Sequence, residues 1–261
     1  MNSVNKTLYI PLYGKAYVSK KGIILKDKKA EEIWDNEGFE LKGKSKSKWL
    51  AYFMGMRSSV FHLWVKEKLT ELNDATVIHI GCGMDSRVLR VGTHNHKWYD
   101  VDFSEVICER KLHYSENADY KMLEGDARNP EWLNEISERK SAVVIIEGVS
   151  MYLKPEEIRN LITTLNSHFD KIALMMDCYT EMSAKISKYK NPINDVGVTT
   201  VYGTDNPKIF ETGGFKFIKE HNMTSDTLID ELKGMEKCIF KKLYGGKFSK
   251  KMYRLFEYKS V

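Results

Sequence analysis

The sequence lacks any long apolar segment. Its apolar runs, such as that at 142–146, are far shorter than the roughly 20 residues that a membrane-spanning helix needs. The first residues, MNSVNKTLYIPLYGK, do not combine the basic start, apolar stretch and small-residue cleavage site of a secretory signal. Apolar residues make up 42% of the 261 positions and charged residues 30%, which is typical of a globular protein. We therefore expect a cytoplasmic protein that has no membrane partner.

Cysteine is also scarce, and the sequence has only four of these residues. No two of them have the C-x-x-C spacing of a zinc site, and their wide separation does not indicate a disulfide framework. The pattern fits a reducing compartment, and we expect no bound metal. The cysteines are Cys82, Cys108, Cys178 and Cys238.

The net charge of +5 is unevenly distributed along the chain. Residues 1–48 and 233–261 are both basic, whereas the middle of the chain is acidic. Basic ends are compatible with a nucleic-acid or acidic partner, but few of these lysines alternate with the aromatic residues that a base-stacking surface needs. The asparagine–proline–aromatic motif of nucleic-acid amino methylases is absent as well. We therefore favour solvated lysine-rich faces and do not expect a nucleic-acid partner.

From residue 75 onward, strand-like and helix-like segments alternate. Such alternation predicts crossover units, and hence a parallel sheet with helices on both faces. Proline residues stand at two of the predicted helix starts, where the missing N–H group costs nothing. The predicted strands are 75–80, 97–103, 120–126, 142–148 and 171–177, and the predicted helices between them are 86–92, 104–114, 130–138 and 155–169.

The C-terminal part has a different pattern. We predict strands at 215–222 and 253–259, separated by a long helical segment at 225–243 and a basic turn. The last strand then lies antiparallel beside its predecessor, which makes an α/β fold with a seven-stranded, mostly parallel, Rossmann-like sheet. We assign residues 74–261 to this domain.

The N-terminal part should form a helical extension. Apolar residues recur at helical spacing in 7–21 and 48–72, and the polar stretch 42–48 between them reads as a mobile linker. We assign residues 1–73 to a helical cap or lid that packs on the core.

The first strand of the sheet ends in HIGCGMDSR at 79–87. A glycine-rich turn here, at Gly81 and Gly83, allows the backbone to approach a ligand closely. The second strand ends in Asp102, 19 positions after Gly83, where a carboxylate can accept hydrogen bonds from both hydroxyls of a ribose. The alternative is a simple tight turn beside a surface acid.

The turn lacks the third glycine of the dinucleotide motif G-x-G-x-x-G. Ser86 stands at that position, with Asp85 beside it. A carboxylate at this helix start would repel a pyrophosphate, but it is compatible with a sulfonium ligand that carries an amino group. The turn therefore argues against NAD. Two further acids, Asp126 and Glu147, end the third and fourth strands, where open α/β sheets bind their ligands.

These residues resemble those of the leucine carboxyl methyltransferase family, which includes bacterial enzymes of tetracenomycin-type polyketide O-methylation. The resemblance extends over about 150 residues, and the pairing of GCGMDSR with VDF is its most specific part. The segments that carry it are LYGKAY (12–17), VIHIGCGMDSRVLR (77–90), WYDVDFSEV (98–106), GDAR (125–128) and EGVSMYL (147–153).

The resemblance implies an enzyme that uses S-adenosylmethionine and releases S-adenosylhomocysteine. It assigns no catalytic residue, and it implies structural roles for Arg87 and Arg90. The positions that it implies for cofactor binding are Lys15 and Arg57 at the carboxylate, Gly81 and Gly83 at the turn beside the methionine portion, Asp102 at the ribose, Asp126 and Ala127 at the adenine, and Glu147 at the methionine end.

No motif for the acceptor is evident after the fifth strand, so the leucine specificity of the eukaryotic members cannot be transferred. A carboxylate acceptor needs no base, whereas an alcohol or phenol needs one within hydrogen-bond reach. The possible bases are His62, His79, Asp177 and Tyr179, each of which has a structural alternative. The tyrosines that we expect to line the acceptor pocket are Tyr9, Tyr13, Tyr152 and Tyr179.

We therefore predict an S-adenosylmethionine-dependent O-methyltransferase that acts on a carboxylate or hydroxyl of a small, polyketide-like molecule or of a peptide C-terminus. The alternatives are an NAD-dependent oxidoreductase and a non-catalytic protein that retains the fold as a scaffold. The sequence does not indicate an oligomeric state.

Overall fold

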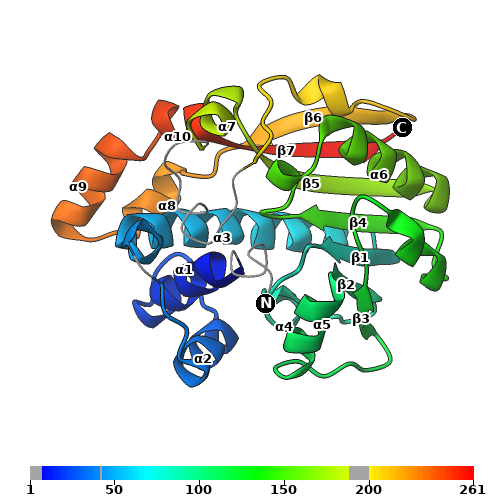
Figure 1. Ribbon diagram of the computed structural model, residues 1–261, viewed down its shortest axis with the longest axis horizontal. Coiled ribbons are helices and arrows are strands. Elements are labelled where there is room, and N and C mark those ends of the chain that lie inside the picture. Colours follow the sequence, from blue (N-terminus) through cyan, green and yellow to red (C-terminus); the bar gives the residue numbers. More distant parts are fainter. Residues whose placement is uncertain (1–7, 42, 188–199) are drawn as a thin grey trace.

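The protein contains one twisted sheet, which is shown in Figure 1. The structure is a computed structural model that describes residues 8–41, 43–187 and 200–261. Within these ranges the sheet has seven strands in the order β3-β2-β1-β4-β5-β7-β6. The strands are β1 (Ala75–Ile80), β2 (Trp98–Asp102), β3 (Tyr120–Glu124), β4 (Ser141–Ile146), β5 (Lys171–Tyr179), β6 (Phe215–His221) and β7 (Tyr253–Ser260).

The direction of the strands confirms the predicted fold class. The neighbours from β3 to β5 are all parallel, whereas β7 is antiparallel to both β5 and β6. The last strand of the chain therefore lies between two earlier strands. This topology brings Tyr253, the first residue of β7, opposite Tyr179 at the carboxyl end of β5.

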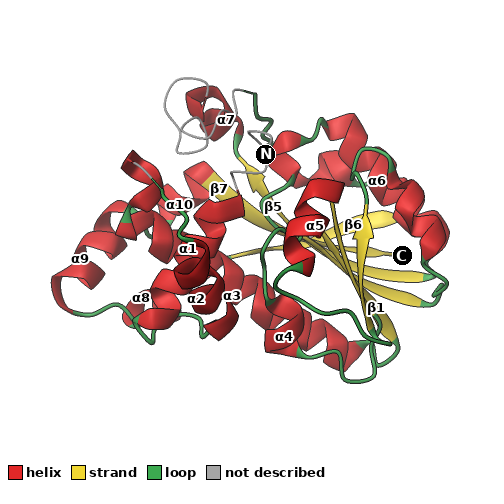
Figure 2. Ribbon diagram, turned by 60° about the horizontal axis from the view of Figure 1, so that its bottom comes forward, coloured by secondary structure: helices red, strands yellow, loops and turns green. Residues whose placement is uncertain are grey.

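Helices cover both faces of the sheet, as Figure 2 shows. Alternate strand residues point to opposite faces, so Val143 and Ile145 of β4 pack in one buried cluster and Val144 and Ile146 in another. The first cluster includes residues of α3, α4 and α5, and the second includes residues of η3 and α6. The bounds are α3 (Lys48–Glu71), α4 (Arg87–Val91), α5 (Ser104–Lys111), the 3-10 helix η3 (Pro130–Glu135) and α6 (Pro155–His168).

A helical layer lies at one end of the sheet. In Figures 1 and 2, α1, α2, α8 and α9 lie together on the side away from α6. Val18 of α1, Met56 of α3 and Phe240 of α9 share one buried apolar cluster. The N-terminal helices therefore pack against segments from near the C-terminus. The remaining bounds are α1 (Tyr9–Lys20), α2 (Lys28–Glu37), η2 (Gly43–Lys46), η4 (Ser150–Tyr152), α7 (Glu181–Ser187), η6 (Pro207–Phe210), α8 (Asp226–Asp230), α9 (Gly234–Leu243) and α10 (Lys247–Met252).

Helix α2 was not among the predicted elements, although both of its ends carry sequence signals. The Asp27 carboxylate accepts a hydrogen bond from the Ala30 N–H group at 2.9 Å, which is an N-cap. Gly38 ends the helix in the left-handed conformation, at a φ of 62°.

Three predictions about local structure are wrong. Residues 43–46 of the expected mobile linker form η2, where Ser45 is buried and the Lys46 carbonyl accepts from the Tyr13 hydroxyl. The expected long helix at 225–243 is two helices, because Leu232 turns into the core and Gly234 has a φ of 56°. The expected basic turn before the last strand is helix α10. No helix in the described ranges is long and apolar enough to span a membrane.

Candidate cofactor site

A cavity of about 870 Å³ opens at the carboxyl ends of the parallel strands. One part of its wall comes from the segments that follow β1, β2 and β3, including Gly81, Asp102 and Ala127. The opposite part comes from α3 and from the segments after β4 and β5. Helix α1 closes one side with Lys15. The sheet thus gathers residues from distant parts of the chain around one space.

The turn after β1 has the conformation that its glycines allow. Gly81 and Gly83 have φ values of 66° and 49°, which favour glycine. A Cβ atom on Gly81 would lie 2.1 Å from Cγ2 of Val149, so no larger residue fits there without a shift. Both glycines line the cavity, as expected for close approach of a ligand to their backbone.

The Asp102 carboxylate is fixed by the same turn. It accepts hydrogen bonds from the N–H groups of Gly83 and Phe103, both at 2.8 Å. Burial raises the pKa of Asp102 despite these two hydrogen bonds. Each carboxylate oxygen keeps further lone pairs, and the residue lines the cavity. Asp102 can therefore accept hydrogen bonds from a ligand without first reorienting.

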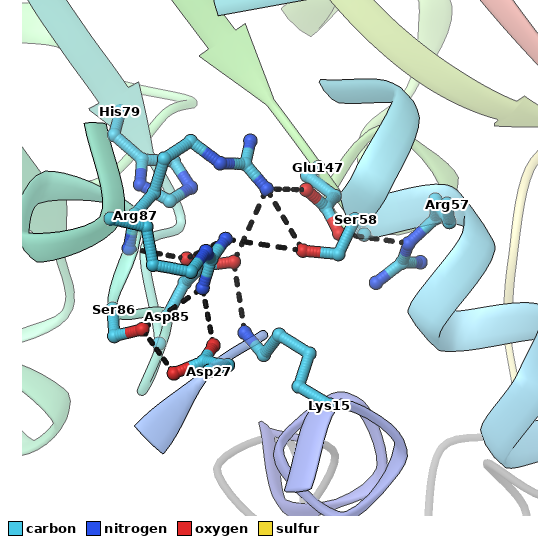
Figure 3. A network of polar contacts seen from close by, with 12 residues as sticks. Lys15, Asp27, Arg57, Ser58, His79, Asp85, Ser86, Arg87 and Glu147 are labelled. Atoms are coloured by element: carbon cyan, nitrogen blue, oxygen red, sulfur yellow. Dashed lines mark hydrogen bonds and ion pairs between the residues drawn. The ribbon is translucent and has the colours of Figure 1, made fainter. Parts of the chain in front are cut away.

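A network of buried charges lies beside this turn, as Figure 3 shows. The Lys15 ammonium is 2.8 Å from Oδ2 of Asp85, and both side chains are almost fully buried. Arg87 donates to Glu147 and contacts Asp85 at 3.3 Å. Although burial raises the pKa of Asp85 and of Glu147, the neighbouring cations lower both, so both stay carboxylates. We call this set the charged cluster: Lys15, Asp27, Arg57, Asp85, Arg87, Arg90, Glu147 and Asp177.

The charged cluster is electrically balanced when each member has its ordinary ionised form. It contains four cations and four carboxylates, each within 4 Å of an opposite charge. Burying unpaired charges is costly, and this pairing avoids that penalty. A net charge of zero suits a ligand group that carries one positive and one negative charge, because such a group leaves the balance unchanged.

Arg57 reaches the cavity from α3 with its guanidinium in a fixed position. Its Nε donates to Oε1 of Glu147 at 3.1 Å, and its Nη1 donates to the Tyr253 hydroxyl at 2.7 Å. Burial lowers the pKa of Arg57, but Tyr253, Glu147 and Asp177 together raise it well above its usual value. Nη2 lies 3.3 Å from the position that a Cβ atom on Gly148 would occupy. A side chain at Gly148 would therefore crowd the guanidinium. Within the described residues the hydrogen bonds of Arg57 use Nε and Nη1, and Arg57 lines the cavity.

Asp126 and Ala127 lie at the other end of the cavity, after β3. The Asp126 carboxylate accepts two hydrogen bonds from Nε of Arg128, each at 2.9 Å. Burial raises the pKa of Asp126, but the hydrogen bonds from Arg128 outweigh it and lower that pKa. An adenine contact at Asp126 and Ala127 stays a prediction.

The four predicted acceptor tyrosines lie in two different places. Tyr152 and Tyr179 are among the lining residues of the cavity. Tyr9 and Tyr13 are not: the ring of Tyr9 stacks on Phe39 with centroids 3.8 Å apart, and Tyr13 packs against Trp34. Both rings thus belong to the packing of the helical layer, and we do not carry them forward as acceptor contacts.

Of the four possible bases, Tyr179 lines the cavity and packs edge-on against Tyr253. The other three have contacts or positions that suit a structural role. His62 lies outside the cavity lining, and burial with the nearby Arg90 lowers its pKa to about 4. His79 lines the cavity, but its Nδ1 is 3.4 Å from the buried Asp100. Asp177 is fully buried and accepts from the Gly148 N–H group.

Sequence reasoning missed three members of the site. Asp85 was read only as compatible with the ligand, yet it binds Lys15, Arg87 and Arg90. Asp27 accepts from Arg90 and from Ser86, and thereby joins α2 to the turn. Tyr253 was not a candidate, because no local pattern marks a tyrosine at the start of the last strand.

One group of described residues has the geometry to hold a metal ion, and it lies outside the cavity. The possible ligand atoms of Glu37, Glu109 and His113 are within 4.8 Å of one another. Glu37 is the last residue of α2, Glu109 lies in α5, and His113 follows α5.

Comparisons with known proteins find a family match and two relatives. The leucine carboxyl methyltransferase family model matches residues 6–166, more than half of the chain. The chain is 25% identical over 246 residues to the tetracenomycin polyketide synthesis O-methyltransferase TcmP of Streptomyces glaucescens, covering 92% of this chain and 90% of that protein. It is 24% identical over 236 residues to an S-adenosyl-L-methionine-dependent methyltransferase of Gibberella zeae, covering 81% and 79%.

A solved structure shares the fold. The magnesium protoporphyrin IX methyltransferase of Synechocystis, with bound S-adenosylhomocysteine, aligns with a TM-score of 0.53 at 13% identity. The alignment covers 90% of this chain and 100% of that one. At this identity the likeness concerns the fold alone.

Proposed function

The chain belongs to the leucine carboxyl methyltransferase family and is an S-adenosylmethionine-dependent methyltransferase, and we propose that it methylates an oxygen atom of a small molecule or of a peptide C-terminus. The observation that carries the cofactor is the cavity at the strand ends, where a fixed carboxylate and a balanced charged cluster border the same space. The oxygen acceptor is supported by the O-methyltransferase of Streptomyces glaucescens. The chemistry of these groups matches the two ends of the cofactor.

The residues present fit S-adenosylmethionine. Its amino-acid end carries an ammonium and a carboxylate, and the charged cluster offers both signs with no net charge. Arg57 and Lys15 both line the cavity, Arg57 with Nε and Nη1 already hydrogen-bonded and Lys15 next to Asp85. Asp102 offers fixed acceptors for the ribose hydroxyls. We propose Lys15 and Arg57 for the carboxylate, the glycine turn for the methionine portion, and Asp102 for the ribose.

The remaining assignments extend this arrangement. We propose that Asp126 and Ala127, which line the end of the cavity after β3, contact the adenine. Glu147 accepts from Arg57 and Arg87 and lines the cavity, so it is placed to receive the ammonium of the methionine end. Because both of its oxygens already accept from an arginine, Glu147 stays a carboxylate at neutral pH.

The chemical contribution of the chain is mainly positioning. When bound, S-adenosylmethionine supplies a methyl group on a positively charged sulfur, which is already reactive toward an oxygen nucleophile. Holding donor and acceptor in line can lower the activation free energy of methyl transfer by roughly 7–11 kcal/mol. The apolar and aromatic side chains of Phe53, Met151 and Met252 line the cavity and limit the entry of water.

An oxygen acceptor is supported by the Streptomyces relative, which is an O-methyltransferase of polyketide synthesis. A carboxylate acceptor is itself the nucleophile and needs no base. Of the possible bases, His62 and Asp177 lie outside the cavity lining, and Asp177 is fully buried. Nδ1 of His79, which lines the cavity, is 3.4 Å from the buried Asp100. A carboxylate, or a hydroxyl acidic enough to ionise without a strong base, therefore agrees best with the site.

Calorimetry with S-adenosylhomocysteine tests the cofactor assignment. Asp102→Asn keeps the size of the side chain and removes its charge, and we expect an affinity about 10- to 100-fold lower, since hydrogen bonds to charged groups contribute about 1.5–3 kcal/mol. Glu124→Ala is the matched control, because Glu124 is the register partner of Asp102 on β3 but does not line the cavity. Equal affinities for wild type and Asp102→Asn would contradict the assignment.

The acceptor is tested with labelled donor and panels of carboxylic acids, phenols and amines, followed by mass spectrometry. We expect the products to be methyl esters or ethers. Any turnover would show that the protein is an enzyme and not a non-catalytic scaffold. Methylation of nitrogen alone, or no turnover in an extract of the native host, would argue against the proposed oxygen acceptor.

A further inference from the structure

Tyr253 connects the last strand of the chain to the arginine of the cofactor site. Its hydroxyl accepts from Nη1 of Arg57 at 2.7 Å and donates to Oδ2 of Asp177 at 2.6 Å. Tyr253 and Asp177 are 6% and 0% exposed, so water does not compete for these contacts. Both residues lie outside the family match at 6–166, yet they contact Arg57 within it.

The direction of these hydrogen bonds follows from the groups involved. A guanidinium only donates and a carboxylate only accepts, so the Tyr253 hydroxyl must donate to Asp177 and accept from Arg57. Burial raises the pKa of Tyr253 well above its usual value, so the hydroxyl keeps the proton that it donates. Tyr253 therefore presents a lone pair to Arg57 in one defined direction.

The Asp177 carboxylate, which accepts from Tyr253, is itself held in a fixed position. The Gly148 N–H group donates to both of its oxygens, at 2.8 and 2.9 Å, and Nη1 of Arg57 is 3.2 Å from Oδ2. Gly148 also packs against the guanidinium, because a Cβ atom there would lie 3.3 Å from Nη2 and 3.4 Å from Nη1. One backbone position thus fixes the carboxylate and borders the guanidinium, whose Nε and Nη1 already have partners.

The Tyr253 ring is held as well. It packs edge-on against Tyr179 at 5.2 Å and Phe53 at 6.2 Å between ring centroids. Both of these rings, like that of Tyr253, line the cavity. The hydroxyl therefore cannot move away from Arg57 without disturbing the aromatic wall.

We propose that Tyr253 is a positioning residue, which holds the Arg57 guanidinium so that Nη2 faces the carboxylate of the cofactor. This inference rests on the proposed function, in which Arg57 binds that carboxylate. It assigns part of the cofactor site to the C-terminal strand, whose only marked feature in the sequence is its strand pattern.

Calorimetry with two ligands tests the proposal. S-Adenosylhomocysteine carries the amino-acid end, whereas 5′-methylthioadenosine retains the adenosine and the thioether but lacks that end. For Tyr253→Phe we expect an affinity for S-adenosylhomocysteine about tenfold lower and an unchanged affinity for 5′-methylthioadenosine. A purely structural role would weaken both ligands or neither, and either result would overturn the proposal.

Tyr258→Phe is the matched control. Tyr258 lies on the same strand and is fully buried, and its hydroxyl donates to the Pro207 carbonyl at 2.9 Å, but it does not line the cavity. This variant should lose comparable stability in thermal unfolding and bind both ligands like wild type. If Tyr258→Phe changes the ratio of the two affinities as Tyr253→Phe does, the effect is general to the strand and the proposal fails.

Two further variants distinguish a failure of the proposed role of Arg57 from a failure of the proposed role of Tyr253. Arg57→Met should weaken S-adenosylhomocysteine at least as much as Tyr253→Phe; if it does not, the proposed role of Arg57 fails, whatever Tyr253 does. If Arg57→Met weakens binding and Tyr253→Phe does not, only the positioning role fails. Should Tyr253→Phe not fold, Asp177→Asn removes the charge beneath the same hydroxyl, and the same selective loss is expected.

Discussion

Replacing Gly81 with alanine tests whether the turn after β1 is limited by backbone conformation or by contact. At this position φ is 66°, and a Cβ atom would lie 2.1 Å from Cγ2 of Val149. Two separate costs are therefore expected. The backbone conformation disfavours any side chain, and the new methyl group overlaps a branched side chain that cannot bend away.

The two costs have different magnitudes. A left-handed conformation costs an L residue about 1–2 kcal/mol. Overpacking by a methyl group costs typically another ~1–3 kcal/mol. Gly22 separates them, because its φ is 67° and a Cβ atom there would meet nothing within 4 Å. We expect Gly22→Ala to lower the free energy of unfolding by about 1–2 kcal/mol, and Gly81→Ala by about 2–5 kcal/mol.

Urea denaturation of the two variants and of Gly81→Ala/Val149→Ala measures the difference. The double variant removes the overlapping methyl groups, so it should be more stable than Gly81→Ala despite the loss of the valine side chain. The reasoning is refuted if Gly81→Ala costs no more than Gly22→Ala. It is also refuted if shortening Val149 gives no recovery.

The remaining predictions concern buried charges. Burial raises the pKa of Glu257, but His221, at 2.6 Å, and Lys68, at 3.2 Å, lower it to about 2, below its usual 4.5. The pKa of Glu257 is lower in the folded state than in the unfolded state, so the ionised carboxylate stabilises the fold above pH 4.5, and this stabilisation is lost as the pH falls toward 2. In urea titrations, Glu257→Gln should lower the free energy of unfolding by about 3 kcal/mol at pH 7 and by clearly less at pH 3. Lys15→Met should lower the affinity for S-adenosylhomocysteine about tenfold and leave 5′-methylthioadenosine unaffected in calorimetry, since only the amino-acid end meets the charged cluster. Asp27→Ala removes the N-cap of α2 and a partner of Arg90, and should lower the free energy of unfolding by about 2–4 kcal/mol in thermal or chemical denaturation.

The sheet could be predicted from the sequence because its signals are local. Strands such as β1 and β4 are buried along most of their length, so they read as short apolar runs between helical patterns. The glycine turn and Asp102 follow from their positions at strand ends, which any parallel sheet brings to one edge. Helix α2 was missed although Asp27 and Gly38 mark its ends, because its apolar face is short.

The sequence by itself therefore determined the succession of the seven strands, the strand-end acids and the glycine turn, since each depends on neighbours a few positions away. Only the tertiary structure decided the partners in the charged cluster. Arg57, Asp177 and Tyr253 come from a helix, a parallel strand and an antiparallel strand, far apart in the chain. Their contact exists because β7 inserts between β5 and β6. The pairing of buried charges depends on which segments of the chain meet in space, and no local sequence pattern contains that information.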